Sequence, residues 1–290
     1  MNTTKYAVFT VDVEAFADTE CLSSSGQRIE ADLMDGLDEY LSVLDECGIK
    51  STMFTVGKLA SKIADRLRHH IENGHRLALH GYDHVAPMNL SVEQFREDTR
   101  EAKEMLTELF DAQVEGYRAP CFSLDRERLN VLRELGFQYD SSCLGFQKAR
   151  NTVPLDLDNF EQCREGVYCR KGFYEFEMSK QRIFGKQFPV SGGGYVRLSN
   201  WHFVKTLLRR YIRRKDFYVF YLHPFEMSRR EIPYVKNLKS YDKFYLRYGI
   251  QTYKRKVRWI ISRLKKCGYQ FVTFEELAQI MNHERRENPA

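Results

Sequence analysis

The chain has 290 residues, of which 43% are hydrophobic, 13% aromatic and 29% charged. This composition is typical of a soluble globular protein, and the lack of an apolar run near membrane-spanning length argues against a transmembrane protein. The net charge of +5 is too small to indicate nucleic-acid binding, and we expect no nucleic-acid partner.

The seven cysteines are scattered and contain no Cys-x-x-Cys pair. This pattern favours reduced thiols in a cytosol over a disulfide framework or a cysteine zinc site. The N-terminal segment MNTTKYAVFTVDVEAF enters a strand-like run almost directly, without the basic stretch and apolar core of a signal peptide. We therefore predict a cytoplasmic location.

Short apolar runs alternate with helical patterns along the first half of the chain. Tyr6–Val13 predicts a buried strand, and Asp32–Cys47 predicts a helix with leucines at helical spacing. The runs KSTMFTVG and RLALH predict two further strands around a helix over Lys58–Glu72. Ser91, with Gln94 three residues later, marks the start of a long helix in a capping-box pattern.

The alternation continues with one interruption. EGYRAP and FQYDSS predict two more strands, separated by a helix over Asp125–Leu135. Between residues 143 and 194 the rhythm fails, and we expect loops, a hairpin around GFYEFEMS and a flexible SGGG segment. A helix over Trp201–Ile212, the strand FYVFYLH, a helix over Thr252–Lys266, the strand YQFVTF and a final helix follow.

Repetition of strand and helix predicts parallel strands joined by right-handed crossovers. Seven such strands within one domain, residues 1–290, favour an α/β fold of the distorted (β/α) barrel type. The segment 143–194 is then an insertion at one rim. An open doubly wound sheet is the alternative architecture.

Polar residues follow directly from the apolar runs, at the strand ends where β/α barrels build their active sites. Read in order, they are Asp12, Glu14, His80, His84, Arg118, Asp140 and His223. One carboxylate and two imidazoles suit zinc or another first-row divalent ion and leave a position for water. With a second carboxylate as base and a further histidine as acid, the set predicts metal-assisted hydrolysis of an amide or ester.

The segments TVDVE, HGYDH, GYRAP, YDSS and FYLHP occur in the order and approximate spacing of the polysaccharide deacetylases, which share the NodB homology domain. The chain resembles this family from about residue 5 to residue 281. Segments FRED at 95–98 and GGGYVRL at 192–198 resemble the branch associated with bacterial exopolysaccharide clusters. The resemblance implies a distorted, typically seven-stranded β/α barrel that removes an N-acetyl group from a sugar.

The resemblance also implies catalytic roles. The general base, the arginine that orients it, the general acid and the acid's carboxylate partner would be Asp12, Arg118, His223 and Asp140. The main-chain N–H of Cys121, just after the Arg-x-Pro motif, would help to hold the oxyanion. Cys121 stands where the family usually has an aromatic residue. We interpret its side chain as pocket lining rather than as a nucleophile.

Metal ligands follow from the same resemblance, with one departure. His80 and His84 match the family's two metal-binding histidines. The family's adjacent aspartate pair is absent, because Val13 follows Asp12. We assign Glu14 as the third ligand, since alternate residues of a strand face the same side. The expected cofactor is one divalent ion, Zn2+ first, with Co2+, Ni2+ or Mn2+ as alternatives.

The expected partner is an N-acetylated saccharide, either a polysaccharide or a precursor on a lipid or nucleotide carrier. Two alternatives stay open. One is hydrolysis of ureide or cyclic amide C–N bonds, sometimes without metal, by superfamily members whose opening motif also departs from the aspartate pair. The other is a non-catalytic carbohydrate-binding relative. The sequence does not predict the oligomeric state.

The helix that continues to Lys215 sets apolar residues against several arginines, and a second basic cluster covers residues 254–266. A solvated helix face accounts for this pattern. The alternatives are peripheral contact with an anionic membrane at its inner face, or arginine binding of a nucleotide-sugar diphosphate.

Overall fold

The computed structural model describes residues 4–23, 27, 29, 31–145 and 154–287. The chain divides between two units, which we describe separately. Unit 1 comprises residues 1–50 and 180–271, and unit 2 comprises residues 51–179 and 272–290. Within the described ranges, no helix is both long and apolar enough to cross a membrane. The single-domain organisation over 1–290 stays a prediction.

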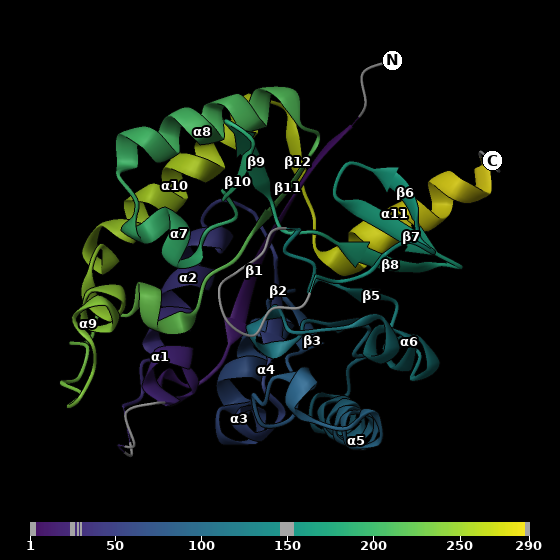
Figure 1. Ribbon diagram of the computed structural model, residues 1–290, viewed down its shortest axis with the longest axis horizontal. Coiled ribbons are helices and arrows are strands. Elements are labelled where there is room, and N and C mark those ends of the chain that lie inside the picture. Colours follow the sequence, from purple (N-terminus) through teal and green to yellow (C-terminus); the bar gives the residue numbers. More distant parts are fainter. Residues whose placement is uncertain (1–3, 24–26, 28, 30, 146–153, 288–290) are drawn as a thin grey trace. The chain divides into compact units, whose positions relative to one another are not determined.

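Unit 1 is built on three parallel strands with β1 (Lys5–Val13) in the middle (Figure 1). β1 pairs with β11 (Phe217–Phe220) and with β12 (Tyr269–Phe271), and every residue of β1 after the first is buried. A strand covered on both faces needs an almost continuous apolar run, which YAVFTVDV supplies.

Helices, short 3₁₀ turns and one hairpin complete unit 1 (Figure 1). In chain order these elements are η1 (Phe16–Asp18), α1 (Glu20–Ser23), α2 (Asp35–Asp45), the antiparallel pair β9 (Lys180–Ile183) and β10 (Lys186–Pro189), α7 (Gly193–Leu198), α8 (Trp201–Arg214), η4 (Pro224–Met227), α9 (Ser240–Arg247) and α10 (Ile250–Lys266).

Unit 2 carries a sheet whose first four strand pairings are parallel and whose last two are antiparallel. Its order is β2 (Ser51–Thr55), β3 (Arg76–Leu79), β4 (Gly116–Tyr117), β5 (Tyr139–Asp140), β8 (Phe173–Phe176), β7 (Val167–Arg170) and β6 (Glu161–Arg164). The remaining elements are α3 (Gly57–Lys62), α4 (Ala64–Glu72), η2 (Pro87–Asn89), α5 (Val92–Phe110), η3 (Pro120–Phe122), α6 (Arg126–Glu134) and α11 (Phe274–Glu287).

All seven predicted strands are present, three in unit 1 and four in unit 2. The capping box at the start of α5 is also confirmed: the Gln94 N–H donates to Ser91 Oγ, and the Ser91 N–H donates to Gln94 Oε1. The predicted helix over Lys58–Glu72 is instead two helices. Ile63 separates them, because its backbone leaves the helical region at φ −120°, ψ 26°.

The segment 143–194 is more regular than predicted, although residues 146–153 of it lie outside the described residues. The hairpin around GFYEFEMS is confirmed as β7 and β8. β8 also pairs in parallel with β5, so this part of the segment extends the sheet of unit 2. The SGGG segment was wrongly predicted to be flexible: Gly192 forms a bridge with Tyr221, and the Gly193 N–H donates to the Tyr221 carbonyl at 2.7 Å.

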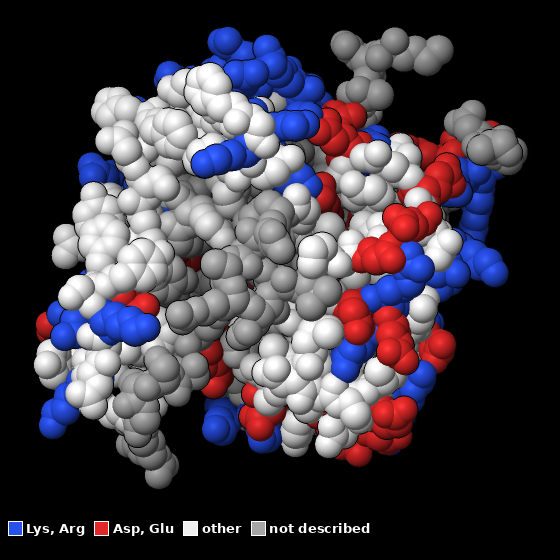
Figure 2. Space-filling view, in the orientation of Figure 1, with Lys and Arg blue, Asp and Glu red and all other residues white. Residues whose placement is uncertain are grey.

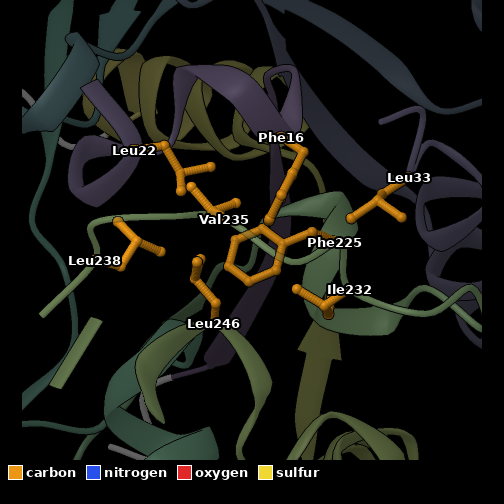
Figure 3. Close-up of a cluster of buried hydrophobic side chains, with 8 residues drawn as sticks. All are labelled: Phe16, Leu22, Leu33, Phe225, Ile232, Val235, Leu238 and Leu246. Atoms are coloured by element: carbon orange, nitrogen blue, oxygen red, sulfur yellow. The ribbon is translucent and has the colours of Figure 1, made fainter. Parts of the chain in front are cut away.

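A buried apolar cluster in unit 1 supports the turn that follows β11 (Figure 3). Phe225, in that turn, packs edge-on against Phe16 with ring centroids 5.6 Å apart and stacks on His223. α2 approaches the same turn from another direction. A β-carbon built at Gly36 would lie only 1.8 Å from the Pro224 carbonyl oxygen, so this contact requires glycine.

Candidate active site

Two carboxylates lie at the carboxyl end of β1. Asp12 and Glu14 are 1% and 5% exposed. β1 ends at Val13, and the Glu14 N–H donates to the Asp12 carbonyl at 3.0 Å. This bond closes a tight turn. Glu14 is therefore the first residue beyond the strand, and the strand alternation from which we assigned it does not extend to it.

His223 follows β11 and lies between two carboxylates. Its Nε2 is 3.8 Å from Glu14 Oε1, and its Nδ1 is 3.3 Å from Glu226 Oε2. Burial alone would lower the pKa of His223, but the charges of Glu14, Glu226 and Asp12 outweigh burial and raise it to about 9. Asp12, Glu14 and His223 thus form one group within unit 1.

Glu226 is a site residue that the sequence analysis missed. It lies in η4, three residues after His223, and its Oε2 also accepts the His223 backbone N–H at 3.1 Å. In the structure Glu226 is the carboxylate within hydrogen-bond distance of His223 Nδ1, whereas Asp140 as a partner of His223 stays a prediction. The order HPFE was a local signal, because a carboxylate three residues after a histidine can fold back onto it in a single turn.

Arg197 holds Glu226 from the opposite side. The Arg197 Nε donates to Glu226 Oε1 at 2.7 Å, and both side chains are fully buried. Its Nη2 donates to the Tyr245 carbonyl at 2.6 Å, and its Nη1 donates to the Tyr248 carbonyl. Burial alone would raise the pKa of Glu226, but Arg197 and then His223 outweigh burial and lower it. Glu226 is therefore a buried carboxylate rather than a neutral acid.

The two predicted histidine ligands lie together in unit 2. His80 is the first residue after β3 and is buried, and its ring centroid is 5.3 Å from that of His84. His80 Nδ1 donates to the Arg118 carbonyl at 2.8 Å, so the lone pair of this imidazole is on Nε2. A metal-binding histidine characteristically has such a second partner, which fixes its tautomer and orientation.

The backbone around these histidines is tightly constrained. His84 has φ 54° and Gly81 has φ 73°, both in the left-handed region. The Gly81 carbonyl accepts the Gly57 N–H at 2.9 Å. A residue other than glycine held in a sparsely populated backbone conformation lowers the folding stability by about 1–3 kcal/mol. Such strained residues cluster at functional sites. The position of His84 beside His80 is therefore maintained at the expense of backbone strain.

Arg118 and Asp140 lie in the same unit, in a fully buried polar group. Arg118 donates from Nε to the Ser141 carbonyl at 3.1 Å and from Nη2 to Ser141 Oγ at 3.0 Å. Asp140 accepts from the Ser142 N–H at 3.0 Å and from Ser142 Oγ at 2.8 Å. The action of Arg118 on Asp12 and of Asp140 on His223 stays a prediction.

Glu175, from β8, is a second buried carboxyl group that the sequence analysis missed. Its Oε1 accepts the Cys143 N–H at 2.8 Å. Burial, followed by the nearby charge of Asp140, raises the pKa of Glu175 well above its ordinary value. The folded protein therefore holds the Glu175 proton to higher pH than the unfolded chain does. No sequence signal marked it, because its segment was expected to be an insertion.

Cys121 begins an unusual turn after Arg118-Ala-Pro. Its φ is 57° and that of Phe122 is 56°, two consecutive left-handed residues that are not glycine. The next two N–H groups donate to the carbonyls of Ala119 and Pro120. The turn is thus held at both ends, with the Cys121 peptide between them. Donation from the Cys121 N–H to an oxyanion stays a prediction.

Comparison with known families decides the classification. The family model described as polysaccharide deacetylase matches residues 32–139, and one described as a domain of unknown function (DUF3473) matches residues 141–279. Residues 32–139 therefore form a domain of the polysaccharide deacetylase family. A peptidoglycan deacetylase-like protein of Gibberella zeae is 29% identical over 148 residues, which are 49% of this chain and 44% of that protein. The chain therefore spans less than half the length of this relative.

Two solved structures share the fold of this chain. One, from Mycobacterium smegmatis, is assigned to the polysaccharide deacetylases; it is 18% identical, has a TM-score of 0.61 and covers 98% of this chain and 93% of its own. The other is an allantoinase, 16% identical, with a TM-score of 0.61 and coverage of 98% and 91%. These likenesses confirm the predicted α/β fold of the distorted (β/α) barrel type.

The buried pair of Arg197 and Glu226 predicts a coupled effect on stability. Arg197→Met should lower the free energy of unfolding by about 3–5 kcal/mol, because it leaves the Glu226 carboxylate buried without its cation. Adding Glu226→Gln should restore part of that loss, because no buried charge is then left unpaired. Urea unfolding of the wild type, both single variants and the double variant measures the coupling. Additive losses would show that the two side chains act independently.

The raised pKa of Glu175 predicts a pH dependence of stability. The folded protein keeps this proton above 4.5, the ordinary value, whereas the unfolded chain releases it. The unfolding free energy should therefore fall as pH rises, by up to about 1.4 kcal/mol per pH unit, until the native group itself ionises. Glu175→Gln removes this pH-dependent contribution. The unfolding free energy of the variant, relative to that of the wild type, should therefore increase between about pH 5 and about pH 8.

Urea unfolding at both pH values tests this sign. Glu165→Gln is the matched control, because it removes an exposed carboxylate from the same segment. A stability difference between Glu175→Gln and wild type that stays constant with pH would mean that Glu175 is ionised in the folded protein.

Proposed function

We propose that the protein is a metal-dependent hydrolase that removes an N-acetyl group from an N-acetylated sugar. The observation that carries the proposal is the placement of His223. Its Nδ1 is held by a buried carboxylate, Glu226, and its Nε2 faces Glu14 at the end of β1. An imidazole fixed in this way can deliver a proton at one defined nitrogen, which an amine leaving group requires.

The residues present fit a divalent metal. His80 presents Nε2 as its lone-pair nitrogen, and each of His80, His84 and Glu14 offers one ligand atom of a type that Zn2+ accepts. We propose that these three residues hold one ion, Zn2+ first, with Co2+, Ni2+ or Mn2+ as alternatives. When bound, such an ion acts as a Lewis acid toward the acetyl carbonyl and the attacking water.

The chain's own residues divide the remaining work. Asp12 accepts a proton from the attacking water, and Arg118 keeps the Asp12 carboxylate oriented. The Cys121 N–H donates to the oxygen that becomes negative as the acetyl carbon turns tetrahedral. His223 gives its proton to the sugar nitrogen as the C–N bond breaks, so that water and amide become acetate and amine. Asp140 stays the carboxylate that the family resemblance assigns to tune His223.

The saccharide and its compartment are part of the proposal. An N-acetylated sugar in a polysaccharide, or in a lipid-linked or nucleotide-linked precursor for exopolysaccharide, fits the family, and the predicted location is the cytoplasm. Release of acetate from an N-acetylated oligosaccharide by the metal-loaded protein tests the reaction. Hydrolysis of a cyclic ureide without acetate release would instead indicate a ureide hydrolase, and saccharide binding without turnover would indicate a binding protein.

The ligand assignment predicts selective loss of metal. The His80→Ala/His84→Ala variant should lose essentially all of its divalent ion, because a single carboxylate binds such ions weakly. Asp12→Asn should retain the ion, since it leaves all three proposed ligands in place. Elemental analysis of purified protein measures both outcomes, with the exposed His69→Ala as the control. Equal metal content in the double variant and the wild type would place the ion elsewhere.

The proton-transfer assignment predicts different effects at Asp12 and His223. Asp12→Asn should lower kcat by about 10²-fold or more, the scale for removal of a general base. His223→Ala should slow cleavage of the N-acetyl sugar more than cleavage of an aryl acetate, because an aryl oxide leaves without a proton. Parallel assays on both substrates measure this ratio. Equal losses on both, or loss of metal from His223→Ala, would contradict the general-acid role.

A further inference from the structure

The hairpin of unit 1 has an unusual residue at its tip. Phe184 and Gly185 join β9 to β10 with φ values of 46° and 79°. Two consecutive left-handed residues are characteristic of the tight hairpin turn that favours Asn-Gly, and a bulky residue at the first position is strained. The Phe184 side chain is also 101% exposed. Phe184 therefore combines a strained backbone with a fully solvent-exposed aromatic ring.

The tip is surrounded by basic residues and is attached to α8. Arg182 and Lys186 are exposed on either side of the turn. Phe188 of β10 packs edge-on against Phe203 of α8, with ring centroids 5.9 Å apart, and Phe203 is itself 46% exposed. The hairpin is thus seated on α8 rather than extended into solvent as a separate element.

α8 presents a basic face beside this hairpin. Its inner face is buried through Val204, Leu207, Leu208, Tyr211 and Ile212, so the helix is packed on the unit. Its outer face exposes Arg209, Arg210, Arg213 and Arg214, and the helix has no acidic residue. Figure 2 shows Lys and Arg side chains gathered over α8, at the top of the view.

The arginines of α8 differ from the basic residues of α10. Lys254 and Arg258 of α10 form ion pairs with Glu39 and Glu46 of α2. Among the described residues, no carboxylate forms an ion pair with the four arginines of α8. Between residues 180 and 271 the chain has 23 Lys and Arg but only 4 Asp and Glu, so positive charge is concentrated in this part of the sequence.

We propose that the hairpin–α8 surface, made of Arg182, Phe184, Lys186, Phe203 and the four arginines of α8, binds an anionic lipid bilayer with the Phe184 ring inserted among the headgroups. A soluble polyanion without aromatic groups would satisfy the cations but would leave the Phe184 ring in water. A bilayer satisfies both, because basic side chains attract anionic headgroups and an aromatic ring gains from burial at the interface. This proposal does not depend on the deacetylase activity.

Vesicle binding tests the proposal. The wild type should sediment with vesicles of phosphatidylcholine and phosphatidylglycerol, and not with phosphatidylcholine alone. Replacing the four α8 arginines with glutamine should weaken binding by at least about 10²-fold, since each basic side chain near an anionic bilayer contributes about fivefold. Turnover of a small soluble substrate should be unchanged, because none of the four is in the active site. Equal vesicle binding by this variant and the wild type would leave α8 as a solvated face and overturn the proposal.

Phe184→Asn separates insertion from charge alone. Asparagine is favoured in this turn, so the variant should fold at least as stably as the wild type, yet it should bind anionic vesicles roughly tenfold more weakly. Tyr241→Asn, which removes another exposed aromatic ring from the same unit, is the matched control and should bind like the wild type.

Phe184→Trp supplies a direct readout of depth. Brominated phosphatidylglycerol should quench the fluorescence of this variant more than that of the wild type, whose Trp201 and Trp259 give the background. No added quenching, or Phe184→Asn bound as tightly as the wild type, would overturn insertion. Single-stranded nucleic acid that binds the wild type as tightly as anionic vesicles do, and displaces it from them, would also overturn the proposal and assign the surface to a polyanion.

Discussion

The buried ion pair between Arg197 and Glu226 is the interaction on which the histidine end of the site depends. A charge away from water is tolerated only when its polar atoms are paired. Glu226 meets this condition with one oxygen on Arg197 and the other on His223, and Arg197 meets it with carbonyls at the end of α9. The same contacts therefore pair the buried charges of Arg197 and Glu226 and fix the orientation of the His223 imidazole.

The sequence predicted the elements whose signals are local. Strands buried on both faces appear as continuous apolar runs, and the Ser91 capping box marks a helix start, so both could be recognised without knowing the fold. The site residues were recognisable because polar groups follow such runs directly. Within unit 1 the structure brings together Asp12, Glu14 and His223, and within unit 2 it places His80 beside His84 and against the Arg118 carbonyl.

The residues that were missed depend on partners far along the chain. Arg197 and Glu175 look like ordinary surface residues in a sequence, because their burial is set by segments that pack on them only in the folded protein. Glu226 differs from these two residues, because the local segment HPFE places it one turn after His223, whereas the family resemblance implies Asp140 as the carboxylate partner. The role of β8 could not be predicted either, since a four-residue strand that extends a sheet has no periodicity long enough to distinguish it from a loop.

The close approach of α2 to the turn that begins at His223 has a consequence for engineering. On most helices, replacing glycine by alanine is a reliable stabilising change, worth about 1 kcal/mol through helix propensity. A consensus or propensity-based redesign of α2 would therefore choose alanine at Gly36. The new methyl group would overlap the Pro224 carbonyl and displace the turn that carries His223. Helix propensity and the placement of His223 are in conflict at this one position, so a library for a more thermostable variant should hold Gly36 fixed.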